Sequence, residues 1–462
     1  MTEFKDLGLA EPILQALDAK NYKQPTPIQA QAIPALLEGR DLCGIAQTGT
    51  GKTAAFALPS LHYFHENPKA TPARGCRMLV LSPTRELAAQ IADSFRDYAR
   101  FMKLSIATVF GGVPINRQIN SLRVGVDILV ATPGRLLDLI DQRALTLKDV
   151  EIFVLDEADQ MMDLGFIHAI KRIDKMLPKD RQSLFFSATM PQAISDLGSQ
   201  FLTDPVKVSV APQSTTAERV QQYATFVSQP EKQALLTITV KDEQIDRALI
   251  FTRTKHGADR VVRFLEGAGI KAAAIHGNKS QAQRTAALQA FRHGHVKLLV
   301  ATDIAARGID VSGVSHVINF ELPNVAEQYV HRIGRTARAG AEGIAISFVA
   351  DDERPYLRAI EKTTRIKLDV VALPENFAEA VRNLPKPAAR KDGGDQGRGG
   401  GGGRPPRAHD GNRGNADRAH RAQQPREEGA GGDNKGAKRP FRPRRSNGVG
   451  AHRGAVQRSG GR

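Results

Sequence analysis

The segment AQTGTGKT, from Ala46 to Thr53, holds the residues with the clearest chemical potential in this chain. It follows the apolar run from Leu42 to Ile45 and precedes the apolar stretch from Ala54 to Leu58. This pattern predicts a strand, a glycine-rich turn and the start of a helix. Backbone N–H groups at such a helix start point outward and bind anions.

The residue types in this loop fit a phosphate group. Gly49 and Gly51 let consecutive N–H groups turn toward one anion, and Lys52 can reach the outer phosphates. The Thr53 hydroxyl is a ligand for Mg²⁺. Ala46 stands where the strict pattern has its first glycine, so a chance glycine-rich turn is the alternative. The candidate nucleotide-binding set is Ala46, Gln47, Thr48, Gly49, Thr50, Gly51, Lys52 and Thr53.

A strand-like run that ends in two carboxylates is the second landmark. The segment EIFVLDEAD, from Glu151 to Asp159, places Asp156 and Glu157 after the apolar residues. Ligands of open α/β sheets bind at the carboxyl ends of the strands. We therefore expect Asp156 to hold Mg²⁺ through its water shell, and Glu157 to orient and deprotonate the water that attacks a γ-phosphate. A solvated acidic turn is the alternative, and the GKT loop about 100 residues upstream argues against it.

The segment HRIGRTARAG, from His331 to Gly340, concentrates basic side chains. Arginine meets phosphate oxygens in a bidentate and always charged geometry. If two domains close face to face, Arg335 and Arg338 become arginine fingers that act on the γ-phosphate from across the cleft. A solvated basic helix face is the alternative.

Strand-like apolar runs alternate with helical patterns in two series. The first comprises residues 42–45, 78–81, 106–110, 128–131, 152–155 and 184–186, and the second comprises 220–227, 248–251, 272–275, 298–301, 316–320 and 344–349. This alternation predicts α/β domains with parallel sheets flanked by helices. The stretch APQSTTAE, from Ala211 to Glu218, predicts a linker between them. The second series has no GKT loop, so it must serve the site in another way.

Most of the basic excess lies at the carboxyl end. Residues 386–462 carry 19 Lys and Arg against 7 Asp and Glu, which is +12 of the total net charge of +16. Their only aromatic residue is Phe441, so this Gly/Arg-rich stretch cannot bury enough apolar surface to fold. We predict a disordered polycation that neutralises phosphates without sequence preference, with a merely solubilising tail as the alternative.

The remaining composition narrows the class of protein. Cys43 and Cys76 are the only cysteines, without a CxxC pair or a histidine cluster, which indicates neither a disulfide framework nor a zinc site. The amino terminus lacks the pattern of a signal peptide, and no run is apolar enough to cross a membrane. We expect a cytoplasmic protein with no membrane partner.

Eleven motifs follow one another between residues 4 and 348. They are YKQPTPIQ, AQTGTGKT, PTRELAAQ, the Gly111 and Gly112 pair, TPGR, DEAD, SAT, LIFTRT, HGNKSQAQR, ATDIAARGID and HRIGRTARAG. In this order they resemble the DEAD-box ATP-dependent RNA helicases, and among them the bacterial RhlE-type group. The resemblance implies two tandem RecA-like domains that close on ATP, Mg²⁺ and RNA. It predicts a Q-motif region at 1–32, an ATP-binding domain at 33–206, a linker at 207–217, a helicase C-terminal domain at 218–380 and the tail at 381–462.

The resemblance also implies contacts to the nucleotide. Tyr22 would stack on adenine and Gln29 would read its edge, since an amide can donate to N7 and accept from N6. Asn21 replaces the usual glycine before the aromatic residue, and asparagine tolerates a positive φ. From its residue type alone, Tyr22 would instead be a core aromatic. Asp310 would contact the ribose.

Contacts to the RNA sugar and phosphate backbone are implied for Thr84, Arg85, Gly112, Thr132, Arg135, Arg253, Gly277, Arg284 and Thr302. Hydroxyls, guanidinium groups and N–H groups read no bases, which predicts recognition without sequence specificity. A helix cap is the local alternative for each threonine. Ser187, Thr189 and His331 would couple hydrolysis to strand separation.

The motifs favour local separation of short RNA duplexes, with ribosomal RNA in pre-ribosomes, structured messages or the RNA-degradation machinery as contexts typical of the family. One rival to this function is a DNA translocase built on the same pair of domains. Comparing the stimulation of ATPase activity by RNA and by DNA of equal length distinguishes the two functions. The other rival is an RNA annealer or scaffold in which the tail binds RNA and ATP only gates that binding. Annealing assays without nucleotide test that rival.

Truncation near Arg382 tests the predicted tail. We expect ATP chemistry at saturating RNA to be unchanged and the apparent RNA affinity to fall. The slope of log affinity against log salt should become shallower, by about one unit for each phosphate that is no longer neutralised. RNA binding at several salt concentrations measures this for the full chain and the truncation. Superimposable lines would mean that the tail only solubilises.

Overall fold

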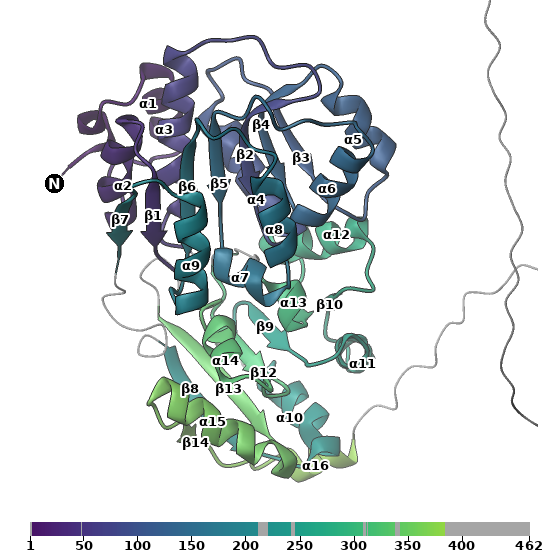
Figure 1. The fold of residues 1–462 in the computed structure, drawn as a ribbon. Helices are drawn as coiled ribbons and strands as arrows, with labels where there is room; N and C mark the ends of the chain where they lie inside the picture. Colours follow the sequence, from purple (N-terminus) through teal and green to yellow (C-terminus); the bar gives the residue numbers. More distant parts are fainter. Residues whose placement is uncertain are drawn as a thin grey trace, which may run out of the picture. The chain divides into compact units, whose positions relative to one another are not determined.

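The computed structural model describes residues 2–47, 49–210, 220–241, 245–307, 311, 313–337 and 342–383. This description leaves out residues 211–217 of the predicted linker and the tail beyond residue 383. It also leaves out the candidate residues Thr48, Asp310 and Arg338. Two seven-stranded sheets organise the described residues (Figure 1).

The first sheet is built from the strands β1 (Leu42–Ile45), β2 (Cys76–Leu81), β3 (Ile106–Val109), β4 (Val126–Ala131), β5 (Ile152–Leu155), β6 (Gln182–Ser187) and β7 (Val206–Ser209). They lie in the order β3-β4-β2-β5-β6-β1-β7, and all neighbours are parallel. The helical segments of this part are η1 (Phe4–Leu7), α1 (Glu11–Asp18), α2 (Pro27–Leu37), α3 (Lys52–Glu66), α4 (Arg85–Tyr98), α5 (Ile115–Leu122), α6 (Pro133–Asp141), α7 (Ala158–Asp163), α8 (Ile167–Asp174) and α9 (Gln192–Phe201).

Both faces of the first sheet are buried under helices. In β5, Val154 packs into one hydrophobic cluster with Phe56 of α3 and Phe95 of α4. Its neighbour Phe153 packs into the opposite cluster with Phe201 of α9. Parallel strands covered on both faces are apolar throughout rather than alternating, which is why the continuous apolar runs mark them in the sequence.

The second sheet is built from β8 (Val220–Phe226), β9 (Ala248–Phe251), β10 (Ala272–Ile275), β11 (Leu298–Ala301), β12 (His316–Asn319), β13 (Gly343–Val349) and β14 (Asp369–Val370). Their order is β10-β11-β9-β12-β13-β8-β14, again with all neighbours parallel. Its helical segments are η2 (Gln229–Glu231), α10 (Lys232–Thr239), α11 (Lys255–Gly267), α12 (Gln281–Arg292), α13 (Asp303–Ala306), α14 (Ala326–Ile333), η3 (Asp351–Glu353), α15 (Arg354–Thr364) and α16 (Phe377–Arg382). The predicted fold class, tandem RecA-like α/β domains, is confirmed.

The two sheets follow one topological plan, strand for strand. The strand β8 has the place in the second sheet that β1 has in the first. The helix α3 after β1 begins at Lys52, and the helix α10 after β8 and η2 begins at Lys232. The second sheet therefore places a lysine at the topological position of the GKT lysine, without the glycine-rich loop.

Two edge strands were not expected from the sequence. The strand β7 pairs with β1 and extends the first sheet through Ser209, beyond the predicted domain end at 206. The two-residue β14 pairs with β8. Short strands at a sheet edge have one face or side exposed and lack the continuous apolar pattern of the central strands.

Cys43 and Cys76 are buried free thiols. Among the described helices, none combines the length and the apolar character needed to cross a membrane.

Candidate active site

The loop between β1 and α3 has the backbone that its glycines allow. Gly49 and Gly51 have φ values of 85° and 97°, in the left-handed region. A Cβ on Gly51 would lie 2.3 Å from Nε2 of Gln29 and 2.8 Å from Oγ1 of Thr26. The loop is closed by a hydrogen bond from the Thr50 hydroxyl to the Gln47 carbonyl, 2.7 Å. Glycine at position 51 therefore permits both the turn and the close approach of the Q-motif helix α2.

A buried ion pair joins this loop to the acidic motif. The Lys52 ammonium lies 2.7 Å from Oε1 of Glu157, and both side chains are almost completely buried. Glu157 itself has φ 57° and ψ 51°, a left-handed backbone that is uncommon for glutamate. Its other oxygen accepts a 2.8 Å hydrogen bond from Gln160. Backbone geometry and two partners thus fix the carboxylate that the sequence nominates as the catalytic base.

The charges of this cluster are unequal. Burial alone would lower the pKa of Lys52, but Glu157 and Asp156 together raise that pKa above its usual value, so the ammonium stays charged. Burial, opposed by the Lys52 charge and supported by the Glu157 charge, raises the pKa of Asp156 to about 7. Oδ1 of Asp156 is buried without a hydrogen-bond partner among the described residues. An orphaned carboxylate oxygen beside a further carboxylate is an environment that a cation would stabilise.

The Q-motif residues line the same cavity as the loop. Asn21 has φ 61°, the left-handed conformation expected for an asparagine in place of glycine. The ring of Tyr22 is 44% exposed, so the core-aromatic alternative is wrong for this residue. Gln29 is bound at both ends of its amide: Oε1 accepts from the Thr26 N–H at 2.9 Å, and Nε2 donates to the Gly51 carbonyl at 3.1 Å. Gln29 therefore connects α2 directly to the phosphate loop.

One cavity of about 690 Å³ collects these groups. Its walls include Tyr22, Gln29, Gly49, Gly51, Lys52, Thr53, Asp156 and Glu157. The helix α4 adds a wall that the sequence analysis missed, namely Leu87, Gln90, Ser94 and Tyr98. These four share one helix face by their spacing, and Nε2 of Gln90 is buried without a partner among the described residues. The i, i+3 and i+7 spacing was readable from the sequence, but nothing in it shows that this face borders a cavity.

Two of the predicted coupling residues, Ser187 and Thr189, are hydrogen-bonded to the phosphate loop and to the acidic motif, respectively. The Ser187 carbonyl accepts from the Ala46 N–H at 3.0 Å, at the start of the phosphate loop. The Thr189 N–H and hydroxyl both donate to Oδ2 of Asp159, each at 3.0 Å. The Ser187 hydroxyl donates to the Thr189 carbonyl at 2.7 Å. The SAT segment thus bridges the loop and the acidic motif through short polar contacts.

The basic segment at the end of α14 is not a solvated face. Arg332 is 1% exposed and forms a two-pronged pair with Asp303 of α13 at 2.5 and 2.8 Å. Arg335 is also buried, and its Nε donates to the His331 carbonyl at 3.2 Å. Burial and the nearby Arg335 charge lower the pKa of His331, which favours its neutral form. The solvated-face alternative is wrong for Arg332 and Arg335.

Three of the predicted RNA-binding arginines form a positive cluster. Burial, then Arg284 and Arg135, lower the pKa of Arg85. Nη2 of Arg284 lies 2.8 Å from Oε2 of Glu86, which neutralises part of this charge. Gly112 has φ 82°, and a Cβ there would lie 1.9 Å from Nη1 of Arg85. A side chain at position 112 would therefore be strained by the backbone and would displace the Arg85 guanidinium. The clustered guanidinium groups provide a site for an anion.

The remaining RNA candidates differ in their local roles. The Thr84 hydroxyl caps α4 by accepting from the Leu87 N–H at 3.2 Å, so the capping alternative applies to it. Thr132 and Thr302 occupy the N-cap positions of α6 and α13 without a side-chain capping bond. Gly277 follows β10 with open space where a Cβ would stand. Arg253 follows β9 and is described below.

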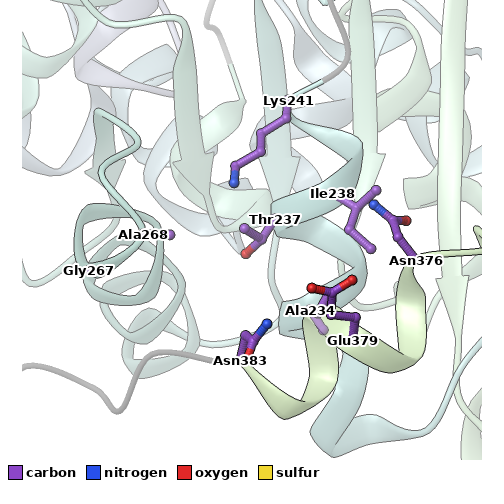
Figure 2. A pocket seen from close by; sticks show the side chains of 10 residues that line it. Ala234, Thr237, Ile238, Lys241, Gly267, Ala268, Asn376, Glu379 and Asn383 are labelled. Carbon is purple, nitrogen blue, oxygen red and sulfur yellow. The ribbon is translucent and has the colours of Figure 1, made fainter.

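A second cavity, of about 490 Å³, lies between α10, the end of α11 and α16 (Figure 2). Its walls are Ala234, Thr237, Ile238, Lys241, Gly267, Ala268, Asn376, Glu379, Ala380 and Asn383. No predicted site residue lines this cavity, and its mixed lining does not select a ligand.

A glycine-rich loop after β1 and two carboxylates after β5, at the same edge of a parallel sheet with β6 between them, define a nucleotide-hydrolysing enzyme of the RecA-like class. The DEAD/DEAH box helicase model matches residues 26–197, and the helicase conserved C-terminal domain model matches residues 230–340. The ATP-dependent RNA helicase CshA of Listeria monocytogenes is 43% identical over 385 residues, which are 83% of this chain and 73% of that protein.

Solved structures agree with this assignment. S. cerevisiae Dbp5 bound to RNA and ADP BeF3 is 31% identical, with a TM-score of 0.70 over 84% of this chain and 100% of that one. Mss116p bound to ssRNA and AMP-PNP is 26% identical, with a TM-score of 0.73 over 83% of this chain and 82% of that one. The chain belongs to the DEAD-box family of ATP-dependent RNA helicases. The RhlE-type subgroup stays a prediction.

The raised pKa of Asp156 predicts a pH-dependent stability. The native protein holds this proton up to about pH 7, whereas an unfolded carboxyl releases it near its ordinary value of 3.8. Stability of the ligand-free protein should therefore fall as the pH rises between these values, by up to about 1.4 kcal/mol per pH unit from this group. Asp156→Asn removes the titration, so its thermal midpoint should rise relative to that of the wild type from pH 5 to about pH 7, and the difference should then level off. Parallel pH profiles for the two proteins would contradict the burial of a protonated Asp156.

Proposed function

We propose that this enzyme hydrolyses ATP in response to RNA and uses the reaction to separate short RNA duplexes locally. The observation that carries the proposal is the single cavity of about 690 Å³ that joins Q-motif, phosphate-loop and DEAD residues. Its lining combines the aromatic Tyr22 with the phosphate-loop residues and Glu157, which suits a nucleoside triphosphate with the base at the Q-motif end. The family membership supports the same reaction class.

The residues around Asp156 fit Mg²⁺. The orphaned Asp156 oxygen, the Thr53 hydroxyl in the same cavity and the excess of carboxylates form an oxygen-rich donor set. We propose that Asp156 and Thr53 hold the ion, largely through water and phosphate oxygens. When bound, Mg²⁺ would neutralise charge on the phosphates as it does in phosphoryl transfer generally.

Glu157 becomes available as a base when ATP binds. Its Oε1 is paired to the Lys52 ammonium in the structure. Phosphate oxygens would compete for that ammonium, because Lys52 extends from the same loop whose N–H groups bind them. The released carboxylate, still held by Gln160 at its other oxygen, can then accept a proton from the attacking water.

The second domain would complete the site and respond to RNA. We propose that Arg335 and Arg338 stabilise the developing charge on the γ-phosphate as arginine fingers, and that Asp310 contacts the ribose. The cluster of Arg85, Arg135 and Arg284 would bind RNA phosphates, with Gly112, Thr132, Gly277, Thr302 and Arg253 as further backbone contacts. Such contacts read no bases, so binding would be independent of sequence.

Coupling would pass through hydrogen bonds that already exist. The SAT segment connects Ala46 of the loop to Asp159 of the acidic motif, so a shift at the phosphates would reach Thr189 directly. We propose ribosome assembly or RNA turnover as the biological context. A cytoplasmic location stays a prediction.

Glu157→Gln tests the assignment of the base. The amide keeps the shape and hydrogen bonding of the side chain but cannot accept the proton, so RNA-stimulated ATPase turnover should fall by roughly two to four orders of magnitude. ATP binding, measured with a fluorescent nucleotide, should persist. As a matched control, Glu151→Gln changes a carboxylate at the opposite end of β5 and should leave turnover near the wild-type value. Near-normal turnover in Glu157→Gln would exclude this residue as the base.

Gln29 predicts a preference for adenine. N7 is an acceptor in both purines, but guanine carries the acceptor O6 where adenine carries the donor N6, so the amide would lose its second hydrogen bond and GTP should support little unwinding. Gln29→Glu keeps the acceptor for the Thr26 N–H but loses the donating NH₂ group. The ratio of ATP turnover to GTP turnover should therefore move closer to one in this variant. Competition between the two nucleotides, measured with both proteins, checks this. Equal use of ATP and GTP by the wild type would refute base reading by Gln29.

A further inference from the structure

The second sheet contains a completely buried ion pair at the topological position of the phosphate loop. Lys232, the first residue of α10, and Glu353, the last residue of η3, form this pair, and both are 0% exposed. The Lys232 ammonium also donates to the carbonyls of Phe320 and Phe348, at 3.0 and 2.9 Å. All three hydrogens of the ammonium thus have an acceptor within the protein, so this lysine has no capacity left for a nucleotide.

The Glu353 carboxylate connects three strand ends. It accepts from the Leu322 N–H after β12 and from the Ala350 N–H after β13, each at 3.1 Å. Its Oε1 also lies 3.2 Å from Nη2 of Arg253, which follows β9. Ligands of parallel sheets bind at this carboxyl edge, so the buried pair fixes the backbone and one side chain where a ligand would meet the domain.

Protein contacts hold Arg253 in place, but its side chain is not fully buried. Its side chain remains 24% exposed. The guanidinium is bracketed by Glu353, by Oδ1 of Asn324 at 3.3 Å from Nη1, and by the ring of Tyr356 at 5.8 Å. Its backbone N–H donates to Glu321 at 2.7 Å. A guanidinium has five donors, and these contacts orient the group while leaving donors that can face a phosphate.

We propose that Glu353 and Lys232 are positioning residues for RNA binding: the buried pair supplies an internal anion that orients the Arg253 guanidinium toward an RNA phosphate. The inference rests on the proposed function, because it assumes that Arg253 contacts RNA. Lys232 serves as the counter-ion of Glu353. Burial lowers the pKa of Lys232, and Glu353 opposes that shift, so each charge of the pair depends on the other.

The test measures RNA affinity of the full chain by fluorescence anisotropy with a single-stranded oligoribonucleotide at several salt concentrations. Arg253→Ala should weaken binding roughly tenfold, as expected when one charged hydrogen bond is removed, and should reduce the salt slope by about one unit. The double variant Lys232→Met/Glu353→Gln removes both buried charges at similar volume. It should reproduce that decrease in affinity and that change in slope, with turnover at saturating RNA and the KM for ATP unchanged.

A double-mutant cycle separates positioning from a general structural defect. If the pair acts through Arg253, the triple variant should bind RNA no more weakly than Arg253→Ala alone. The matched control is Glu151→Gln, which disrupts the ion pair of the partly exposed Glu151 with the buried Arg77 in the first sheet and should leave RNA affinity unchanged. The proposal would be overturned if the triple variant showed the product of the two separate decreases in affinity. Wild-type affinity in either Arg253→Ala or the double variant would also overturn it.

Arg253→Lys keeps the proposal testable if the double variant does not fold. It leaves the buried pair intact and preserves the positive charge, but a single ammonium cannot keep the forked geometry that lets one group face Glu353 and a phosphate together. Its affinity should approach that of Arg253→Ala, and wild-type affinity would overturn the inference. Failure of the proposed function has a different signature, since wild-type ATPase would then be insensitive to RNA.

Discussion

The buried pair of Lys52 and Glu157 is the contact on which the active site depends. Removing either partner would leave an uncompensated charge in a site almost without solvent, at a cost of about 3–5 kcal/mol. The pair therefore holds the phosphate loop and the acidic motif together before any ligand arrives. Under the proposed function, it would also keep the base paired until phosphates compete for the lysine, which would link hydrolysis to substrate binding without a separate switch.

The geometry around this pair arises from the order of the strands. The strands β5, β6 and β1 are neighbours in the first sheet, so the DEAD, SAT and GKT segments begin side by side at one edge. Short hydrogen bonds then connect them, from Ala46 to Ser187 and from Thr189 to Asp159. Since neighbouring strand ends are about 5 Å apart, three motifs far apart in sequence come within reach of one another at this edge.

Much of this arrangement was predictable because its signals are local. Continuous apolar runs identify central strands, and Gly-rich turns identify the loop that follows β1. The contacts of Gln29 with Gly51, the cavity wall formed by Gln90 and the burial of Arg332 were not predictable. Each depends on which side chains a folded sheet brings within hydrogen-bond distance, and residue spacing contains no such distances. The edge strands β7 and β14 were not predicted for a different reason, since edge strands lack an apolar pattern on both faces.

The two buried lysines show how one topological plan gives a binding site in one sheet and a positioning device in the other. Asp156, Glu157 and Asp159 all act on Lys52, so three carboxylates face a single cation. Burial, together with the Glu157 charge, raises the pKa of Asp156 to about 7. Around Lys232 the charges balance, because Glu353 and Glu321 face Lys232 and Arg253. Under the proposed function, Mg²⁺ would relieve the excess of negative charge around Lys52, whereas the balanced cluster around Lys232 needs no ion. This difference in charge explains why only the first sheet needs the glycine-rich loop, and why the second can use its strand ends to hold arginines in place.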